Sequence, residues 1–134
     1  MRKALFVSIA LLALAALVVV PVLTAPTVTK TLLYQDRHGK VYKIAVTFDT
    51  SYPRGGETIT VGQPIDYAFI QDQGYIVTDT AAYFINLDSA TFSSGTFELL
   101  VYKAAKDSTK MMEIPNATNL STLTGVEVIV KTKR

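Results

Sequence analysis

The stretch VYKIAVTFD, residues 41–49, constrains the fold more than any other part of the chain, because apolar and polar side chains alternate along it. One parity carries only large apolar side chains: Tyr42, Ile44, Val46 and Phe48. Successive side chains of a strand point to opposite faces of a sheet, so this pattern predicts a strand with one buried face.

Further strands are predicted at short spacing, over residues 27–35, 65–71, 75–78, 82–87, 96–104, 110–114 and 126–132. Turn-forming stretches such as QDQG, KDSTK and PNATNLSTLTG separate them. Helical periodicity does not appear after Thr24. About eight short strands joined by such turns predict an all-β domain, an antiparallel β-sandwich or a small barrel, preceded by one apolar N-terminal helix.

Two sequence details add to this prediction. Gly39, in the turn DRHGK, can adopt the left-handed conformation that a short hairpin loop requires, so residues 27–35 should pair with the strand at 41–49. The strands at 65–71 and 96–104 carry apolar residues on both faces. Such strands are expected to be buried on both sides, either inside a sandwich or against a neighbouring subunit.

The N-terminus divides the chain into an apolar segment, residues 1–25, and a β domain, residues 26–134. Residues 4–24 carry no charge, and Arg2 and Lys3 precede them. A run of about 20 apolar residues is long enough to span a membrane, and cations at one end hold that end in the cytoplasm. A cleaved signal peptide and a helix buried in a protein assembly remain alternatives. Leu23 and Pro26 make Ala25 a poor cleavage site, so we expect the segment to be retained as a membrane anchor.

The composition of the chain excludes several classes of function. Arg2 and Lys3 account for the whole formal net charge of +2, so the β domain is neutral and offers no general attraction to nucleic acid. The chain has no cysteine, which excludes disulfides, thiolate metal sites and cysteine nucleophiles. His38 is the only histidine and lies in the predicted hairpin turn. No nucleophile motif accompanies it, so we expect a protein without catalytic activity, cofactor or metal.

Charge is unevenly distributed along the β domain. Between Arg54 and Lys103 the chain has no basic residue, and six acidic residues fall there: Glu57, Asp66, Asp72, Asp79, Asp88 and Glu98. The chain ends in KTKR. The simplest interpretation is solvated loop acids and a solvated tail. The alternatives are electrostatic complementarity between subunits and a calcium site among the loop acids, although the spacing matches no calcium-binding loop.

The stretch SYPRGGETIT, residues 51–60, resembles a motif of small structural proteins of tailed bacteriophages, in which a strand ends in Tyr-Pro-x-Gly-Gly-Glu. Similar elements follow in the same order: Ile65, Asp66 and Tyr67, then Gly74 and Tyr75, then Asn119, Leu120, Ser121, Leu123 and Thr124. The resemblance covers roughly residues 41 to 131.

The resemblance implies a non-enzymatic virion protein of the capsid-decoration or minor-capsid type. Its expected partners are capsid or other virion proteins and further copies of itself. The apolar residues 4–24 depart from this family's pattern, and they add a membrane as a further expected partner. An exported cell-surface or periplasmic β-domain, such as an adhesin or filament subunit, is the alternative. The proline and the glycine pair would stiffen the loop, and a rigid loop loses less entropy on docking. The predicted partner-contact loop is therefore Tyr52, Pro53, Arg54, Gly55, Gly56 and Glu57, with a stiff crossover between two sheets as the equally acceptable structural explanation.

Overall fold

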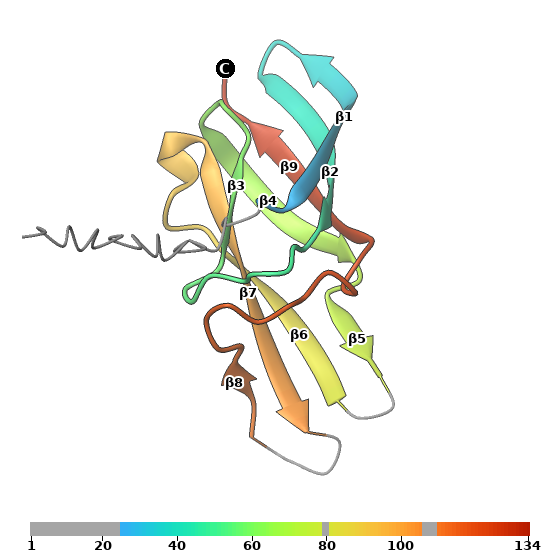
Figure 1. Cartoon of the computed structure of the whole chain (residues 1–134). Coiled ribbons are helices and arrows are strands. Elements are labelled where there is room, and N and C mark those ends of the chain that lie inside the picture. The colour runs from blue at the N-terminus through green and yellow to red at the C-terminus, as the bar shows by residue number, and fades with distance from the viewer. Residues whose placement is uncertain (1–24, 79–80, 106–109) are drawn as a thin grey trace, which may run out of the picture.

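The computed structural model of the chain describes residues 25–78, 81–105 and 110–134. The described residues form nine strands and one 3-10 turn (Figure 1). In chain order they are β1 (Thr27–Asp36), β2 (Gly39–Thr47), β3 (Glu57–Thr60), β4 (Ile65–Asp72), β5 (Tyr75–Val77), β6 (Ala81–Asp88), η1 (Phe92–Ser94), β7 (Thr96–Ala105), β8 (Met112–Glu113) and β9 (Val126–Thr132). The prediction of an all-β domain is confirmed.

The strands form two separate antiparallel sheets. A four-stranded sheet has the order β1-β2-β9-β4, and a five-stranded sheet has the order β3-β7-β6-β5 with β8 paired to β7. The far ends of β6 and β7, together with β5 and β8, extend past the four-stranded sheet (Figure 1).

One core joins the inner faces of the two sheets. The predicted apolar face of β2 is buried and meets β9, whose Val126, Val128 and Val130 alternate inward in the same way. The five-stranded sheet contributes Ile59 from β3, Ile85 from β6, and Phe97, Leu99 and Val101 from β7. Leu120 and Leu123, from the loop before β9, also belong to this core.

The hairpin of β1 and β2 is confirmed, with Thr27 opposite Thr47 and Asp36 opposite Gly39. The reason for a glycine at position 39 differs from the one expected. Gly39 has φ 151° rather than a left-handed helical torsion, and a Cβ atom there would lie 1.9 Å from the carbonyl oxygen of Thr132. Glycine is needed because the backbone of β9 passes directly over it.

Three expectations need correction. Residues 57–60 form β3, where a loop was expected, and the strand expected over 110–114 is limited to β8. Strand β4 is not buried on both sides: its register shifts between Ile65 and Tyr67, so that Ile65 points into the core while Tyr67 and Phe69 are about half exposed.

The predicted N-terminal helix and membrane anchor lie outside the described residues. Within residues 25–78, 81–105 and 110–134, no helix is long and apolar enough to cross a membrane.

Candidate functional site

The predicted contact loop is the connection between the two sheets. Strand β2 ends at Thr47 in the four-stranded sheet, and β3 begins at Glu57 in the other. Between them, Phe48 is buried in the core and Tyr52 forms an isolated antiparallel bridge with Thr118. The loop is therefore attached to the chain segment that precedes β9.

Tyr52 anchors the loop from inside the protein. Its side chain is fully buried, and its hydroxyl oxygen accepts a hydrogen bond from the Val101 backbone N–H at 3.0 Å. The same hydroxyl donates to Glu113 Oε1 at 3.5 Å. Burial, together with the negative charge of Glu113, raises the pKa of the Tyr52 hydroxyl to about 12. It therefore stays protonated and able to donate.

The backbone of the loop tip is held by the segment around β8. Glu113 Oε1 accepts a hydrogen bond from Gly55 N–H at 2.6 Å, and Asn116 Oδ1 accepts one from Arg54 N–H at 3.1 Å. Within the loop, Gly56 N–H donates to the carbonyl of Pro53 at 3.1 Å. These contacts tie the backbone of the loop tip to the segment around β8.

Two carboxyl groups lie buried beneath the loop. Glu57 is 4% exposed and Asp49 is 9% exposed. Asp49 Oδ1 accepts a hydrogen bond from Ser51 N–H, whereas Asp49 Oδ2 and Glu57 Oε1 have no hydrogen-bond partner in the protein. Burial, with a smaller contribution from the charge of Asp49, raises the pKa of Glu57 to about 7. The expectation that Glu57 is a solvated loop acid is wrong.

Only part of the predicted contact loop reaches the surface. Tyr52, Gly56 and Glu57 are buried, Pro53 is half-buried, and Arg54 and Gly55 are exposed. Arg54 borders a shallow depression of about 440 Å³ whose other lining residues are Met112, Glu113, Ile114, Pro115 and Asn116. Any partner touching this loop would meet Arg54, Gly55 and that depression.

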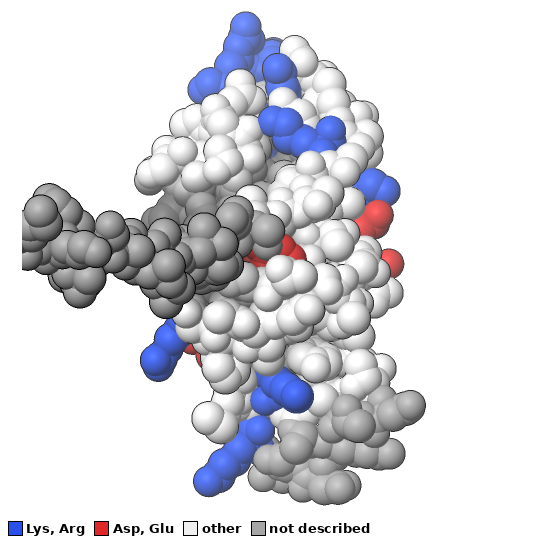
Figure 2. Space-filling model, in the orientation of Figure 1, with Lys and Arg blue, Asp and Glu red and all other residues white. Residues whose placement is uncertain are grey.

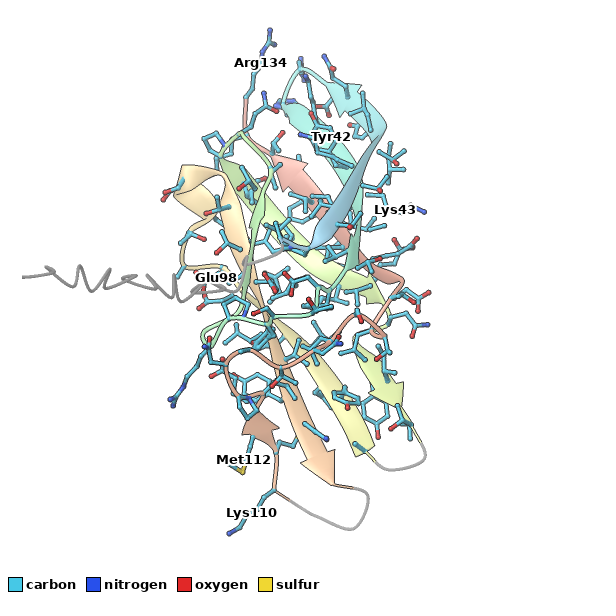
Figure 3. The ribbon with its side chains drawn as sticks, viewed as in Figure 1. Tyr42, Lys43, Glu98, Lys110, Met112 and Arg134 are labelled. Atoms are coloured by element: carbon cyan, nitrogen blue, oxygen red, sulfur yellow. The ribbon has the colours of Figure 1, made fainter. Side chains whose placement is uncertain are left out.

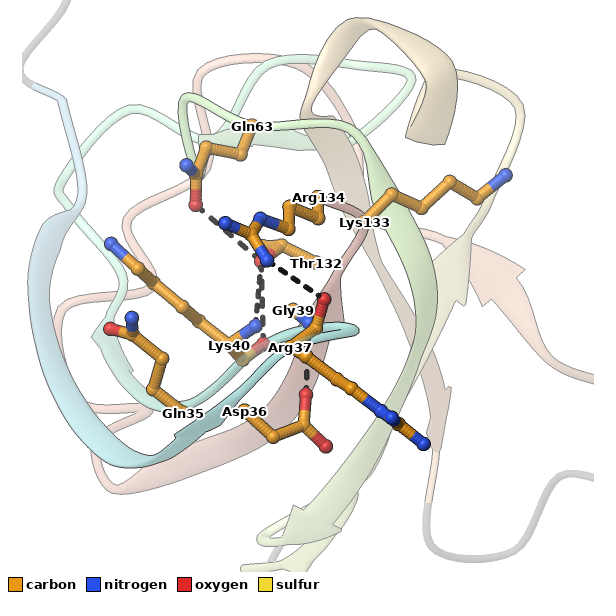
Figure 4. Close-up of a pocket in the computed structure, with 9 residues that line it drawn as sticks. All are labelled: Gln35, Asp36, Arg37, Gly39, Lys40, Gln63, Thr132, Lys133 and Arg134. Atoms are coloured by element: carbon orange, nitrogen blue, oxygen red, sulfur yellow. Dashed lines mark hydrogen bonds between the residues drawn. The ribbon is translucent and has the colours of Figure 1, made fainter.

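A polar cleft of about 450 Å³ lies at the opposite end of the molecule from Met112, next to Arg134 (Figures 3 and 4). Its cationic lining comes from the turn between β1 and β2, from the start of β2 and from the C-terminus: Arg37, Lys40, Lys133 and Arg134. Arg134 donates to the carbonyl of Arg37 at 3.4 Å, and Thr132 Oγ1 bridges Lys40 and Gln63 (Figure 4). Lys and Arg side chains gather at this end (Figure 2).

Lys133 and Arg134, from the C-terminal sequence KTKR, therefore line this cleft. Among the acidic residues of the long basic-free stretch, Asp66, Asp72 and Asp88 are exposed and Glu98 is half-buried, while Asp79 lies outside the described residues. Contact between these acidic residues and the basic end of another subunit stays an untested alternative.

The described residues show no cluster of side chains suited to binding a metal ion. No group of three or more His, Asp or Glu side chains in the described ranges could hold a metal ion. His38 is exposed in the β1–β2 turn, where its Nε2 accepts a hydrogen bond from Arg37 Nε at 2.9 Å. The histidine therefore lies where the sequence predicted it.

The outer face of the four-stranded sheet carries a feature that the sequence did not identify. We call it the aromatic band: Tyr34, Val41, Tyr67, Phe69 and Ile129. Strand pairing places Tyr34, Val41, Lys131 and Tyr67 in one row across all four strands. The adjacent row contains Lys43, Ile129 and Phe69.

The aromatic band is partly exposed to solvent. The Tyr67 and Phe69 rings stack with centroids 6.3 Å apart, and Lys131 Nζ lies 5.9 Å from the Tyr67 ring centroid. The side chains of Tyr34, Tyr67 and Phe69 are 53%, 45% and 50% exposed. The signal for it was the run of apolar residues on both faces of β4, which predicted a core or a subunit contact.

No protein family, curated protein or solved structure matches the chain. The arrangement of the strands defines the class of the protein as a two-sheet antiparallel β domain.

Proposed function

We propose that this chain is a non-enzymatic structural protein of a virion, of the capsid-decoration or minor-capsid type. Its β-sandwich would dock on a lattice of capsid or other virion proteins, and residues 4–24 would attach it to a membrane. The observation that carries the proposal is the aromatic band, together with the motif resemblance around SYPRGGETIT.

The aromatic band supports docking on energetic grounds. Tyr and Phe side chains bury about 150–250 Å² each when fully covered, so three half-exposed rings leave roughly 300 Å² of mostly apolar surface open. Patches of that size on soluble proteins often mark interaction sites. A band that lies on the outer face of a sheet suits a broad protein surface, whereas small-molecule sites are concave.

The position of the band also fits a lattice protein. It lies on rigid strands, and rigid elements lose little conformational entropy on docking. The stiff crossover loop adds Arg54 as a second exposed contact outside the band. A protein that occupies many equivalent positions needs surfaces that keep one shape, and both features meet that need.

The test is incorporation into particles. Virus particles are purified from a culture that produces this chain, and its copy number is measured against the major capsid protein by quantitative mass spectrometry. We expect a fixed stoichiometry in intact particles. Recovery of the chain only in a cell-envelope fraction would instead support the exported surface or periplasmic β-domain, the function that the apolar N-terminus also fits.

A matched pair of variants tests whether the aromatic band does the docking. Tyr67→Ser with Phe69→Ser removes two exposed rings from the four-stranded sheet. Tyr75→Ser with Phe84→Ser removes two exposed rings, 4.8 Å apart, from the other sheet. We expect the first variant to lose at least tenfold in incorporation and the second to retain it. The reverse result would place the docking surface on the five-stranded sheet and contradict the role of the band.

A further inference from the structure

Strand β1 is a long and unprotected sheet edge. The edges of the five-stranded sheet are short, with four residues in β3, three in β5 and two in β8. Strand β4, at the other edge of the four-stranded sheet, has two register irregularities. Short strands and bulges are the usual protection of edges against pairing with another chain. Strand β1 has ten residues and a single irregularity, between Leu32 and Tyr34.

The side chains of β1 do not protect it either. Its first nine residues are all exposed, and Leu32 and Leu33 are 50% and 52% exposed. Lys30 is the only charged residue of β1 before Asp36. A lysine can guard an edge, but Lys30 turns inward: its Nζ donates to the carbonyl of Val61 at 2.9 Å and lies 4.6 Å from the Tyr42 ring centroid.

We propose that β1 pairs antiparallel with β1 of a second copy of this chain, which joins two four-stranded sheets into one continuous eight-stranded sheet. The inference rests on the proposed function, because it names the contact through which copies of the lattice protein associate. The exposed main-chain N–H and C=O groups of the two edges satisfy each other in this arrangement.

Symmetry and charge favour a second copy as the occupant. Two identical edges that pair antiparallel are related by a two-fold axis, and such an interface closes as a dimer. Residues 31–35 are uncharged, so the pairing places no like charges opposite one another in the middle of the contact. Two paired strands of ten residues form up to about ten hydrogen bonds, the number found in a typical stable interface.

The dimer would also extend the aromatic band. Tyr34 lies in β1 and at the same time belongs to the band. A two-fold axis perpendicular to the sheet keeps both outer faces on one side, so the two bands would lie on the same face of the joined sheet, each ending at its own Tyr34. The apolar surface offered to a lattice is then roughly doubled without any change in the fold.

The experiment uses the absence of cysteine from the chain. Full-length protein in detergent micelles is prepared with a single substitution along β1: Thr29→Cys, Thr31→Cys or Leu33→Cys. In a two-fold antiparallel pair, a residue near the axis meets its own copy. We expect at least one of these variants to form a disulfide-linked dimer in most molecules under mild oxidation. Thr58→Cys, at an exposed position of β3, and Asn86→Cys, on the outer face of β6, are the controls and should remain monomeric.

A second measurement needs no cross-link. The mass of the wild-type protein in micelles, from light scattering corrected for detergent, should be that of two chains. Leu33→Lys should raise the protein concentration at which half of the molecules are dimeric by at least tenfold. Cross-linking no stronger on β1 than at the controls, or a wild-type mass of one chain, would overturn the proposal. A monomer found at fixed stoichiometry in particles would refute the β1 pairing alone, whereas a β1 dimer absent from particles would refute the virion function alone.

Discussion

Gly55 and Gly56 have nearly the same backbone torsion but different surroundings. Their φ angles are 97° and 104°, in a region that residues with a Cβ atom rarely adopt. A Cβ atom on Gly55 would have no atom within 4 Å, whereas one on Gly56 would lie 3.1 Å from the carbonyl oxygen of Leu99 and 3.3 Å from Glu98 Cβ. Substitution of Gly55 therefore tests backbone strain alone, whereas substitution of Gly56 tests strain together with steric contact.

We therefore predict graded effects of alanine at the two positions. Gly55→Ala should lower the free energy of unfolding by about 1–3 kcal/mol, the cost of an unfavourable φ. Gly56→Ala should lower the free energy of unfolding by that amount plus a further loss of about 1–3 kcal/mol, because overpacking against β7 adds to the strain. Chemical denaturation measures both, with His38→Ala as an exposed control close to wild type. Equal losses for the two glycines would show that β7 yields to the extra atom.

The Tyr52 hydroxyl is predicted to be the main polar anchor of the crossover loop. Tyr52→Phe leaves the Val101 N–H without its partner in a fully buried site. A buried donor that loses its acceptor costs about 1–3 kcal/mol, so the free energy of unfolding should fall by that amount. Tyr34→Phe is the matched control, because the Tyr34 hydroxyl bonds Asp36 on the surface. A similar small loss in both variants would mean that water replaces the hydroxyl at Val101.

The fold was predictable from sequence where side-chain alternation was regular. Strand β2 alternates without interruption and its apolar face is buried as predicted. Strand β4 carries apolar residues on both faces, and Tyr67 and Phe69 point outward because a register shift follows Ile65. Register shifts of this kind depend on the partner strand, and the sequence of β4 alone does not indicate them.

The candidate site was less predictable than the fold. The stiffness of the loop could be predicted from Pro53 and the glycine pair, but the burial of Glu57 could not. A carboxylate in a loop is usually solvated, and Glu57 is buried only because β3 pairs with β7 and the loop folds over it. The aromatic band required the order of strands in the sheet, since Tyr34 and Phe69 are far apart in the chain.

Gly39 allows a test of close backbone approach that is independent of the loop. A Cβ atom there would overlap the carbonyl oxygen of Thr132, so Gly39→Ala must push the start of β2 away from β9. We expect a loss of about 1–3 kcal/mol in the free energy of unfolding and faster amide hydrogen exchange near Lys40 and Thr132. Gly62→Ala is the control, since it also has a positive φ but no atom within 4 Å of the added Cβ. Unchanged exchange at Thr132 would contradict the close approach.

The last prediction concerns the pH dependence of stability, which should carry a contribution from Glu57. Burial raises the pKa of Glu57 to about 7 in the folded protein, above its ordinary value of 4.5. Between these two values the folded state holds a proton that the unfolded state has released. The free energy of unfolding must therefore fall as the pH rises through this window, by up to about 1.4 kcal/mol per pH unit for a single group. Below pH 4.5 the stabilising effect of the proton is fully present, and above pH 7 the buried charge faces Asp49 without a hydrogen-bond partner.

Melting temperatures measured from pH 4.5 to pH 8 test this with two variants. Glu57→Gln keeps the shape of the side chain and removes the charge, so its stability should fall less steeply with pH than that of the wild type and exceed it near pH 8. Asp66→Asn removes one carboxyl group from an exposed position and is the control for net charge. Its pH profile should run parallel to that of the wild type, because an exposed carboxylate gains or loses little on folding. A Glu57→Gln profile parallel to that of the wild type would mean that Glu57 is ionised throughout this range and that water or a cation reaches its unpaired oxygen.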